Sequence, residues 1–407
     1  MPSLDKLPTE VVNLICENIS SSIQCQLIST CRRLKTQVVP ILYRDVTLDV
    51  REEDQKSVDS QIACFFRTIR DNLSLALCVR DLSVKGHRPA SIEVGYIPIF
   101  ENDEKDTTDQ QTHQPDTRKL VYETCDTNSV IAAMLHKLEN LETLHLEYQF
   151  WSENGFLPVI YQNCLKKLRK INLGMMFHPY YTGREGELWE RMQGSDQMDM
   201  SRLRSLMSLP LIESITCVAA NDEKDEEIEF ASMLPAQNLT YLKLLRSKMT
   251  PRGLGKILSA TPNLRQLEYE FWIDMKINED PTVYYDGTVL DNALKPVRNV
   301  LERLRLNIRH NGDYKFNGCS WRTEVRGILR SLASFTQLTH LHLPHLLLLG
   351  RSIEEANAVK FVNMLPRSLK FLSVFADSLP PLRPFLPVDF TNEKLLDRLY
   401  EYHRMES

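Results

Sequence analysis

Three histidines have the spacing that comes nearest to a chemical site. His340 and His342 are two residues apart and His345 follows three residues later. Alternate residues of a β-strand point to the same face, so the first two imidazoles would lie together. Imidazole binds zinc, but a tetrahedral site needs further ligands, and no Cys, Asp or Glu completes the set nearby. We therefore expect no metal and no cofactor.

The familiar catalytic patterns are also missing. No segment reads as a nucleophile elbow, a phosphate-binding loop, a zinc-protease helix, a dinucleotide fingerprint or a Cys-x-x-Cys pair. Acidic pairs such as Glu226 and Glu227 stand in charge runs, where a solvated surface is the ordinary meaning. The sequence favours a protein that is not an enzyme, with a hydrolase or transferase on a repeat frame as the weaker alternative.

Composition limits the partners and the compartment. The chain has 407 residues, 43% of them hydrophobic, and a formal net charge of -5, which provides no overall field for binding nucleic acid. Nine scattered cysteines, an odd number, suit a reducing compartment. The richest apolar run, Leu346–Leu349, is far too short to span a membrane, and the first 20 residues lack a signal-peptide pattern. We expect a cytoplasmic or nuclear protein, or both, without nucleic-acid or membrane partners.

One pattern recurs along the chain: an apolar residue, two others, an apolar residue, one other and an apolar residue. The last two apolar residues of a copy point to one side of a short strand. Eight copies are clear: Leu141/Leu144/Leu146, Leu168/Ile171/Leu173, Ile212/Ile215/Cys217, Leu239/Leu242/Leu244, Leu264/Leu267/Tyr269, Leu301/Leu304/Leu306, Leu338/Leu341/Leu343 and Leu369/Leu372/Val374. Two weaker copies precede them: Tyr43/Val46/Leu48 and Val79/Leu82/Val84.

Segments with helical spacing lie between the copies. They are Phe65/Phe66/Ile69/Leu73/Leu77, Ile131/Leu135/Leu138, Leu157/Ile160/Tyr161/Cys164, Leu254/Ile257/Leu258, Val325/Ile328/Leu329/Leu332 and Val359/Val362/Asn363/Leu365. A strand and a helix of this size cannot bury their own apolar faces, so the units must stack. We expect an α/β protein with parallel strands inside a curved solenoid and helices outside.

The repeat is longer than usual. The eight clear copies are on average about 33 residues apart, against about 20 to 29 in ordinary leucine-rich repeats. We assign the excess to loops at Gly174–Met200, Ile273–Val289 and Asn307–Trp321 and to a polar, disordered loop near residues 101–118. Residues 391–407 would form a closing helix or cap, and the solenoid would span 41–390.

Residues 1–40 differ from the repeats. Val11/Val12, Leu14/Ile15 and Ile19 have helical spacing, and a second amphipathic stretch runs from Ile23 to Leu34 after Ser20–Ser22. We place Arg32, Arg33 and Lys35 at the end of this second helix, where cations complement the helix dipole. Three short helices in about forty residues bury little apolar surface, so such a module needs a partner.

The string LDKLPTEVVNLICENISSSIQCQLISTCRRL resembles an F-box, through Leu7-Pro8, Glu10 and Cys31-Arg32-Arg33. Pro40–Leu48 is similar to the segment that joins an F-box to repeats in fungal F-box proteins, and the repeats resemble the leucine-rich class by pattern. The resemblance implies a substrate-recognition subunit of a Skp-cullin-F-box ubiquitin ligase. It also implies an adaptor contact, lined by Leu4, Leu7, Pro8, Val12, Ile15 and Leu27.

Two other interpretations stay open. The N-terminal helices could be the cap of the solenoid, or the chain could be a non-catalytic scaffold that binds a partner without ubiquitin transfer.

The residues between the apolar positions of each copy would form the concave face of the solenoid. They mix charges of both signs with aromatic side chains, which suits a protein partner better than a uniform polyanion. Aromatic residues and arginine are the usual anchors of interfaces. We therefore expect Tyr241, Arg303, Arg305, Phe371 and Phe375 to contact the protein substrate.

Overall fold

The computed structural model describes residues 6–50, 55–86, 94–98, 122–125, 127–147, 165–174, 198–222, 235–274, 282–311, 322–344, 347–348 and 364–375. The chain divides into two units, Met1–Lys167 and Leu168–Ser407. Each unit combines helices with parallel strands, so the predicted α/β class is confirmed.

The first unit begins with helices and continues as a parallel sheet. Strands β1, β2 and β5 pair in that order, and β3 pairs with β4 in an antiparallel ribbon. The helices are α1 (Thr9–Glu17), α2 (Ser21–Ile28), α3 (Arg32–Leu42), α4 (Gln55–Asp71), α5 (Leu73–Ala76) and α6 (Thr127–Lys137). The strands are β1 (Asp45–Val50), β2 (Asp81–Gly86), β3 (Val94–Pro98), β4 (Tyr122–Cys125) and β5 (Thr143–Leu146).

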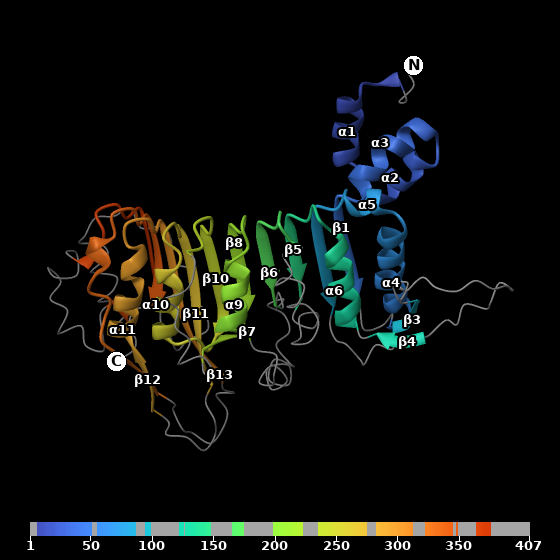
Figure 1. Ribbon diagram of the computed structural model, residues 1–407. Helices are drawn as coiled ribbons and strands as arrows, with labels where there is room; N and C mark the ends of the chain where they lie inside the picture. The colour runs from blue at the N-terminus through green and yellow to red at the C-terminus, as the bar shows by residue number, and fades with distance from the viewer. Residues whose placement is uncertain are drawn as a thin grey trace, which may run out of the picture. The chain divides into compact units, whose positions relative to one another are not determined.

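The second unit contains a larger parallel sheet in the order β6-β8-β10-β11-β13-β15-β16. Its strands are β6 (Lys170–Leu173), β8 (Ser214–Val218), β10 (Tyr241–Ser247), β11 (Gln266–Asp274), β13 (Arg303–Asn311), β15 (His340–Pro344) and β16 (Phe371–Phe375). Two small parallel pairs accompany it, β7 (Met198–Asp199) with β9 (Ala220–Asn221) and β12 (Thr282–Asp286) with β14 (Arg322–Arg326). The helices α9 (Met200–Met207), α10 (Pro251–Ser259) and α11 (Gly287–Leu294) lie over one face of the sheet (Figure 1). Short 3-10 turns occupy Lys295–Val297 and Leu332–Ser334.

Each copy of the sequence pattern lies on its own parallel strand. The register places equivalent residues side by side, as in Leu242 beside Leu267 and Leu267 beside Leu304. The middle and last apolar residues of the eight clear copies are buried, which gives a continuous apolar row under each sheet. The strand prediction from the repeated pattern is therefore confirmed.

Polar groups at the start of the strands also repeat. In three copies, an asparagine lies directly before the first apolar residue. Its side-chain amide donates to a backbone carbonyl in the turn that leads into the preceding copy of the pattern. The Nδ2–O distances are 2.8 Å from Asn140 to Leu77, 2.7 Å from Asn238 to Pro210 and 2.8 Å from Asn263 to Gln237. These bonds satisfy turn carbonyls that have no partner in the sheet and hold neighbouring copies in register.

The helix expected at Val325–Leu332 is not formed. This segment contains the end of β14, then Gly327 with φ +72° and a 3-10 turn from Leu332. The backbone N–H of Ser331, which would serve a helix, instead donates to the buried carboxylate of Asp291 at 3.0 Å. A side chain from another element thus replaces the local helical bond.

Other expectations need smaller corrections. The helical stretch from Phe65 to Leu77 is broken at Asn72 into α4 and α5, and Leu73 and Leu77 are exposed instead of packed. The three expected loops are shorter than predicted, because β7, β12 with the start of α11, and the end of β13 occupy parts of them. Helix α3 extends to Leu42, past the boundary expected at residue 40.

Several predictions lie outside the described residues. These are the polar loop at 101–118, the helix at 157–164, most of the helix at 359–365 and the cap at 391–407.

We predict that replacing Asn238 and Asn263 together by alanine lowers the unfolding free energy of the second unit by about 1–2 kcal/mol, since each change removes one hydrogen bond. Thermal or denaturant unfolding of the full chain measures the change. The control variant, Gln237→Ala with Arg298→Ala, alters two exposed side chains and is expected to stay within about 0.5 kcal/mol of the parent. Equal losses in both variants would contradict a structural role for the asparagines.

Candidate functional site

The three N-terminal helices have a small core of their own. Val12 and Cys16 of α1 pack with Leu34 and Val38 of α3, and all four are buried. Leu7, Ile19, Leu27, Ile28, Cys31 and Ile41 are partly buried around them. Burial of the Cys16 thiol raises its pKa, so it acts as a core side chain and not as a nucleophile.

The connection between α2 and α3 differs from the expectation. Helix α2 ends at Ile28, because the hydroxyls of Ser29 and Thr30 donate to the carbonyls of the last turn, each at 2.7 Å. Cys31 is extended, and Arg32 begins α3. The cationic cluster at Arg32–Lys35 therefore lies at the start of the third helix and does not end the second, so the predicted dipole interaction is wrong.

Two hydrogen bonds attach the start of α1 to α3. The guanidinium of Arg33 donates to the Leu7 carbonyl oxygen at 3.2 Å, and the Gln37 amide donates to the Thr9 hydroxyl at 3.0 Å. Pro8 stands between these anchors at the N-cap, and its carbonyl accepts from the Val11 and Val12 N–H groups. The Leu7-Pro8 pair is thereby held at a defined place on the helical surface.

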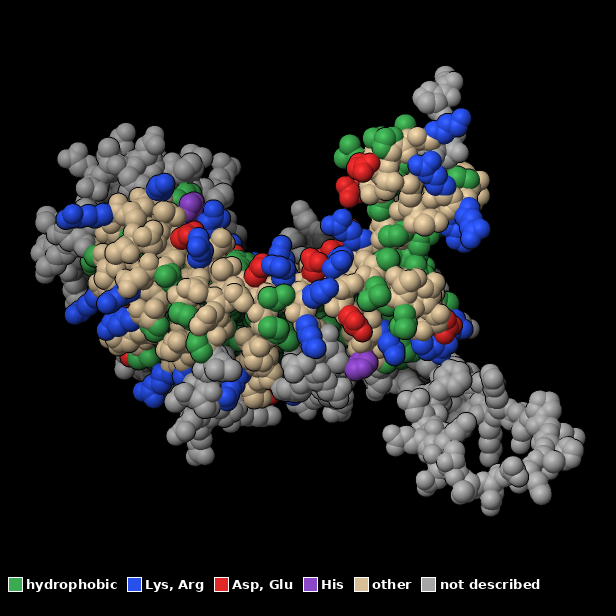
Figure 2. Space-filling view, turned by 45° about the horizontal axis from the view of Figure 1, so that its top comes forward, with side chains coloured by type: hydrophobic (Ala, Val, Ile, Leu, Met, Phe, Trp, Pro, Cys, Tyr) green, Lys and Arg blue, Asp and Glu red, His purple; other side chains and the backbone are tan. Residues whose placement is uncertain are grey.

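Three large apolar side chains remain exposed on the outside of this core. Leu14 is 62% exposed, Ile23 of α2 is 46% exposed and Val11 is 40% exposed. Val11 and Leu14 are three residues apart on α1 and so share a side of that helix. Figure 2 shows hydrophobic side chains (green) on the N-terminal helices, next to acidic ones (red).

The structure assigns different positions to the residues expected at an adaptor contact. Pro8 is exposed, Leu7 and Leu27 are half-buried at the edge of the core, and Ile15 is half-buried. Val12 is only 1% exposed and supports the surface from beneath, so it does not line the surface. Leu4 lies outside the described residues.

Sequence reasoning missed Val11, Leu14 and Ile23 as surface residues. Their helical spacing was visible, but helical spacing alone does not tell which apolar side faces the core.

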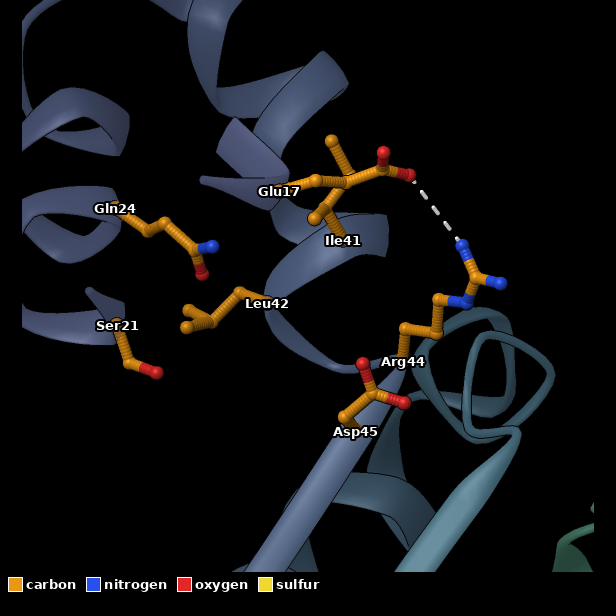
Figure 3. Close-up of a pocket in the computed structure, with 7 residues that line it drawn as sticks. All are labelled: Glu17, Ser21, Gln24, Ile41, Leu42, Arg44 and Asp45. Atoms are coloured by element: carbon orange, nitrogen blue, oxygen red, sulfur yellow. Dashed lines mark hydrogen bonds and ion pairs between the residues drawn. The ribbon is translucent and has the colours of Figure 1, made fainter. Parts of the chain in front are cut away.

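A cavity of about 340 Å³ lies where the helices meet β1 (Figure 3). Gln24 is buried beside it and donates to the Cys16 carbonyl oxygen at 2.7 Å. Glu17 and Arg44 form an exposed ion pair at 3.5 Å across its rim. The remaining lining residues are Ser21, Ile41, Leu42 and Asp45. This arrangement links α1 to the first strand and contains no nucleophile paired with a base.

Two carboxyls stand side by side next to this cavity. Asp45 of β1 and Asp81 of β2 are register partners, so their side chains meet on one face of the sheet. Partial burial, a hydrogen bond with Asp81 and the negative charge of Asp81 raise the pKa of Asp45, in that order of importance, and Arg44 opposes them.

The second unit has a polar face on its parallel sheet. The register aligns Tyr241, Gln266, Arg303, His340 and Phe371 in one row across five strands. The next row, two residues later on each strand, contains Lys243, Glu268, Arg305, His342 and Ser373. We call these two rows the strand face.

Glu268 is the polar centre of the strand face. Its carboxylate accepts a hydrogen bond from the Tyr241 hydroxyl at 3.0 Å and pairs with the Lys243 ammonium at 2.9 Å. Burial raises the pKa of Tyr241, and the Glu268 carboxylate raises it further. Tyr241 is therefore a neutral phenol whose hydroxyl is already bonded to Glu268.

Strand β13, which pairs with β11, carries two cations on the strand face. Arg303 and Arg305 are both exposed on β13, and their charges oppose protonation of His340 and His342 on β15. Burial is the main cause that lowers the pKa of His342, to about 4, and Arg305 adds to it. Burial, Arg303 and Lys370 lower the pKa of His340, whose ring centroid is 5.9 Å from that of Phe371.

The residues expected at a substrate contact are thus brought together in part. Tyr241, Arg303, Arg305 and Phe371 share the strand face, and Phe375 ends β16 with its side chain outside the described part. His340 and His342 lie on one face as expected, and His345 is outside the described residues. Within the described ranges, no three His, Cys, Asp or Glu side chains are arranged to hold a metal ion.

Comparisons with known proteins add no family. No protein-family model matches the sequence, and no curated protein matches it. No helix in the described part of the chain is both long and apolar enough to cross a membrane.

We predict that Asp45→Asn stabilises the first unit at pH 7. The folded chain binds a proton at Asp45 more tightly than the unfolded chain, so this site contributes stability at low pH that is lost as pH rises through its raised pKa. Asparagine removes that loss and can donate to Asp81. The melting temperature of the variant should exceed that of the parent at pH 7, with a smaller difference near pH 4.

The control for this prediction is Glu139→Gln, which removes the same charge at an exposed turn in the same unit. An equal gain in the control, or a gain from Asp45→Asn that is as large near pH 4 as at pH 7, would contradict the carboxyl-pair explanation.

Proposed function

We propose that this chain is the substrate-recognition subunit of a Skp-cullin-F-box ubiquitin ligase. Helices α1–α3 are the F-box and bind the Skp adaptor, and the parallel strands are a leucine-rich-repeat-type solenoid whose strand face holds the protein substrate. The observation that carries the proposal is the exposure of Val11, Leu14 and Ile23 on the two helices that follow Leu7-Pro8.

The contacts within the N-terminal helices support this assignment. Leu7-Pro8 and Cys31-Arg32-Arg33 carry the F-box resemblance from opposite ends of the segment, and the Arg33–Leu7 hydrogen bond joins them at 3.2 Å. Cys31 packs against the common core. The residues of the motif therefore act together in building the surface around Pro8.

The energetics of these exposed apolar side chains favour a protein partner. Burying an exposed side chain of this size contributes about 1.5–3 kcal/mol, so Val11, Leu14 and Ile23 together supply a substantial share of the free energy of a stable complex. The helical core that presents them is small, and docking on a partner would add to its stability by mass action.

The catalytic chemistry belongs to other subunits in this proposal. The chain binds the substrate with one surface and the adaptor with another, which converts a chance encounter of substrate lysine and activated ubiquitin into a tethered one. The ligase would act in the cytoplasm or the nucleus.

We predict that Leu14→Asp abolishes capture of the purified Skp adaptor by the full-length chain, and that Val11→Asp weakens it at least tenfold. A buried, unpaired carboxylate at an apolar contact is strongly unfavourable. Both residues are exposed, so the melting temperature of each variant should stay near that of the parent. Binding is measured by calorimetry or interferometry.

Thr36→Asp is the matched control, because it adds the same charge to an exposed position of α3. Failure of the parent chain to bind the adaptor, or unchanged binding by Leu14→Asp, would contradict the F-box assignment. If the adaptor binds, adding cullin tests the ligase role: a complex with no cullin would favour a scaffold that does not support ubiquitin transfer.

A further inference from the structure

The sheet of the second unit has a local charge opposite to that of the whole chain. In the five copies that include β10, β11, β13, β15 and β16, the positions between the apolar residues, on the strand or directly before it, contain five cations and two carboxylates, whereas the chain has a net charge of -5. The cations are Lys243, Arg265, Arg303, Arg305 and Lys370, and the carboxylates are Glu268 and Glu302.

Both carboxylates are already paired. Glu268 binds Lys243 at 2.9 Å and the Tyr241 hydroxyl at 3.0 Å, and Glu302 binds Arg265 at 3.1 Å. Three exposed cations remain: Arg303, Arg305 and Lys370. Among the described residues, none of their side chains has a hydrogen bond or an ion pair.

The two arginines are arranged to bind anions in series. They are two residues apart on β13, so their side chains leave the same face about 6.6–6.8 Å apart along the strand. A guanidinium group offers a planar fork of donors that matches a carboxylate or a phosphate. An extended peptide running along β13 repeats its own side chains at the same spacing, so it would present two anions two residues apart to the two forks.

The histidines of the next strand, β15, lie directly beside the two arginines. His340 pairs in register with Arg303, and His342 with Arg305. Burial, and after it the charge of the neighbouring arginine, lowers the pKa of each histidine, so at pH 7 both rings are neutral. Neutral imidazoles can donate or accept a hydrogen bond at this surface without adding a charge that would need its own counterion.

Aromatic side chains lie on both sides of Arg303 in its row of the strand face. Tyr241 lies in the same row two strands before Arg303, and Phe371 lies two strands after it. Phe371 and His340 are in ring contact and half-buried. A ligand that extends beyond the arginines would meet an apolar surface, which a simple inorganic anion does not use.

We propose that the strand face binds an anionic segment of a protein partner, in which two acidic or phosphorylated side chains two residues apart pair with Arg303 and Arg305 and an apolar residue packs on Phe371. This inference names the substrate class for the proposed ligase subunit and so rests on the proposed function. A nucleic acid is disfavoured as the ligand, because the chain as a whole is anionic and only three of the five cations are unpaired.

The test is a selection from randomised extended peptides on the purified full-length chain, without adaptor, in two libraries. One library contains Asp and Glu at the varied positions, and the other contains phosphoserine in their place. We expect enrichment of two anionic residues separated by one residue, with an apolar residue nearby. The library that enriches distinguishes carboxylate from phosphate as the source of the charge.

Arg303→Glu with Arg305→Glu should weaken the selected peptides by about 100-fold or more, since two charge-assisted pairs are lost. The matched control, Arg252→Glu with Arg298→Glu, changes the charge equally at exposed positions of the same unit and should leave binding unchanged. Circular dichroism and melting temperature show whether each variant is folded.

Three results would overturn the proposal. They are enrichment of no peptide, enrichment without an anionic preference, and equal binding by the parent and the Arg303→Glu, Arg305→Glu variant. Tighter binding of a single-stranded oligonucleotide than of any selected peptide, lost in the same variant, would assign the strand face to nucleic acid instead. Because adaptor capture is measured separately on α1, failure here leaves the F-box assignment standing, and the reverse also holds.

Discussion

The register of the parallel strands is the constraint from which the other features of the repeats follow. Leu242, Leu267, Leu304, Leu341 and Leu372 are successive register partners and are all buried. Because side chains alternate along a strand, a slip of one residue would move this whole row to solvent and bring charged side chains into the core. The asparagine bonds at the strand starts oppose such a slip. The outward rows are aligned as a consequence, so residues distant in sequence meet on the strand face.

In the N-terminal helices too, the packing of the core decides which side chains are left on the surface. Their core has only four fully buried side chains, and the apolar residues of α1 and α2 exceed what this core can cover. Adaptor docking would cover the excess, and the polar strand face is suited to a partner of opposite charge. The two proposed surfaces thus differ in their physics: apolar burial would provide affinity at α1, and charge pairing would provide selectivity at β13.

Repetition explains why so much of the fold could be predicted. The spacing of apolar residues identified every strand of the main parallel strand order, because each copy must bury the same two positions. The segment Val325–Leu332 was assigned wrongly because the Asp291 carboxylate, from a different element, takes the Ser331 N–H that a helix needs. At α1, helical spacing identified the apolar residues but could not separate buried Val12 from exposed Leu14, because contact with α3 decides which side is the core. That Arg303 and Arg305 have no partner among the described residues was not predictable either, since it depends on Glu268 and Glu302 being paired with Lys243 and Arg265.

Hydrogen–deuterium exchange of the full-length chain, with and without saturating Skp adaptor, tests the central claim most directly. The account predicts slower exchange in α1 and α2 on adding the adaptor, with no change in β10, β11 or β13. An adaptor that slows exchange only in the strands, or that changes exchange nowhere in the chain, would contradict it.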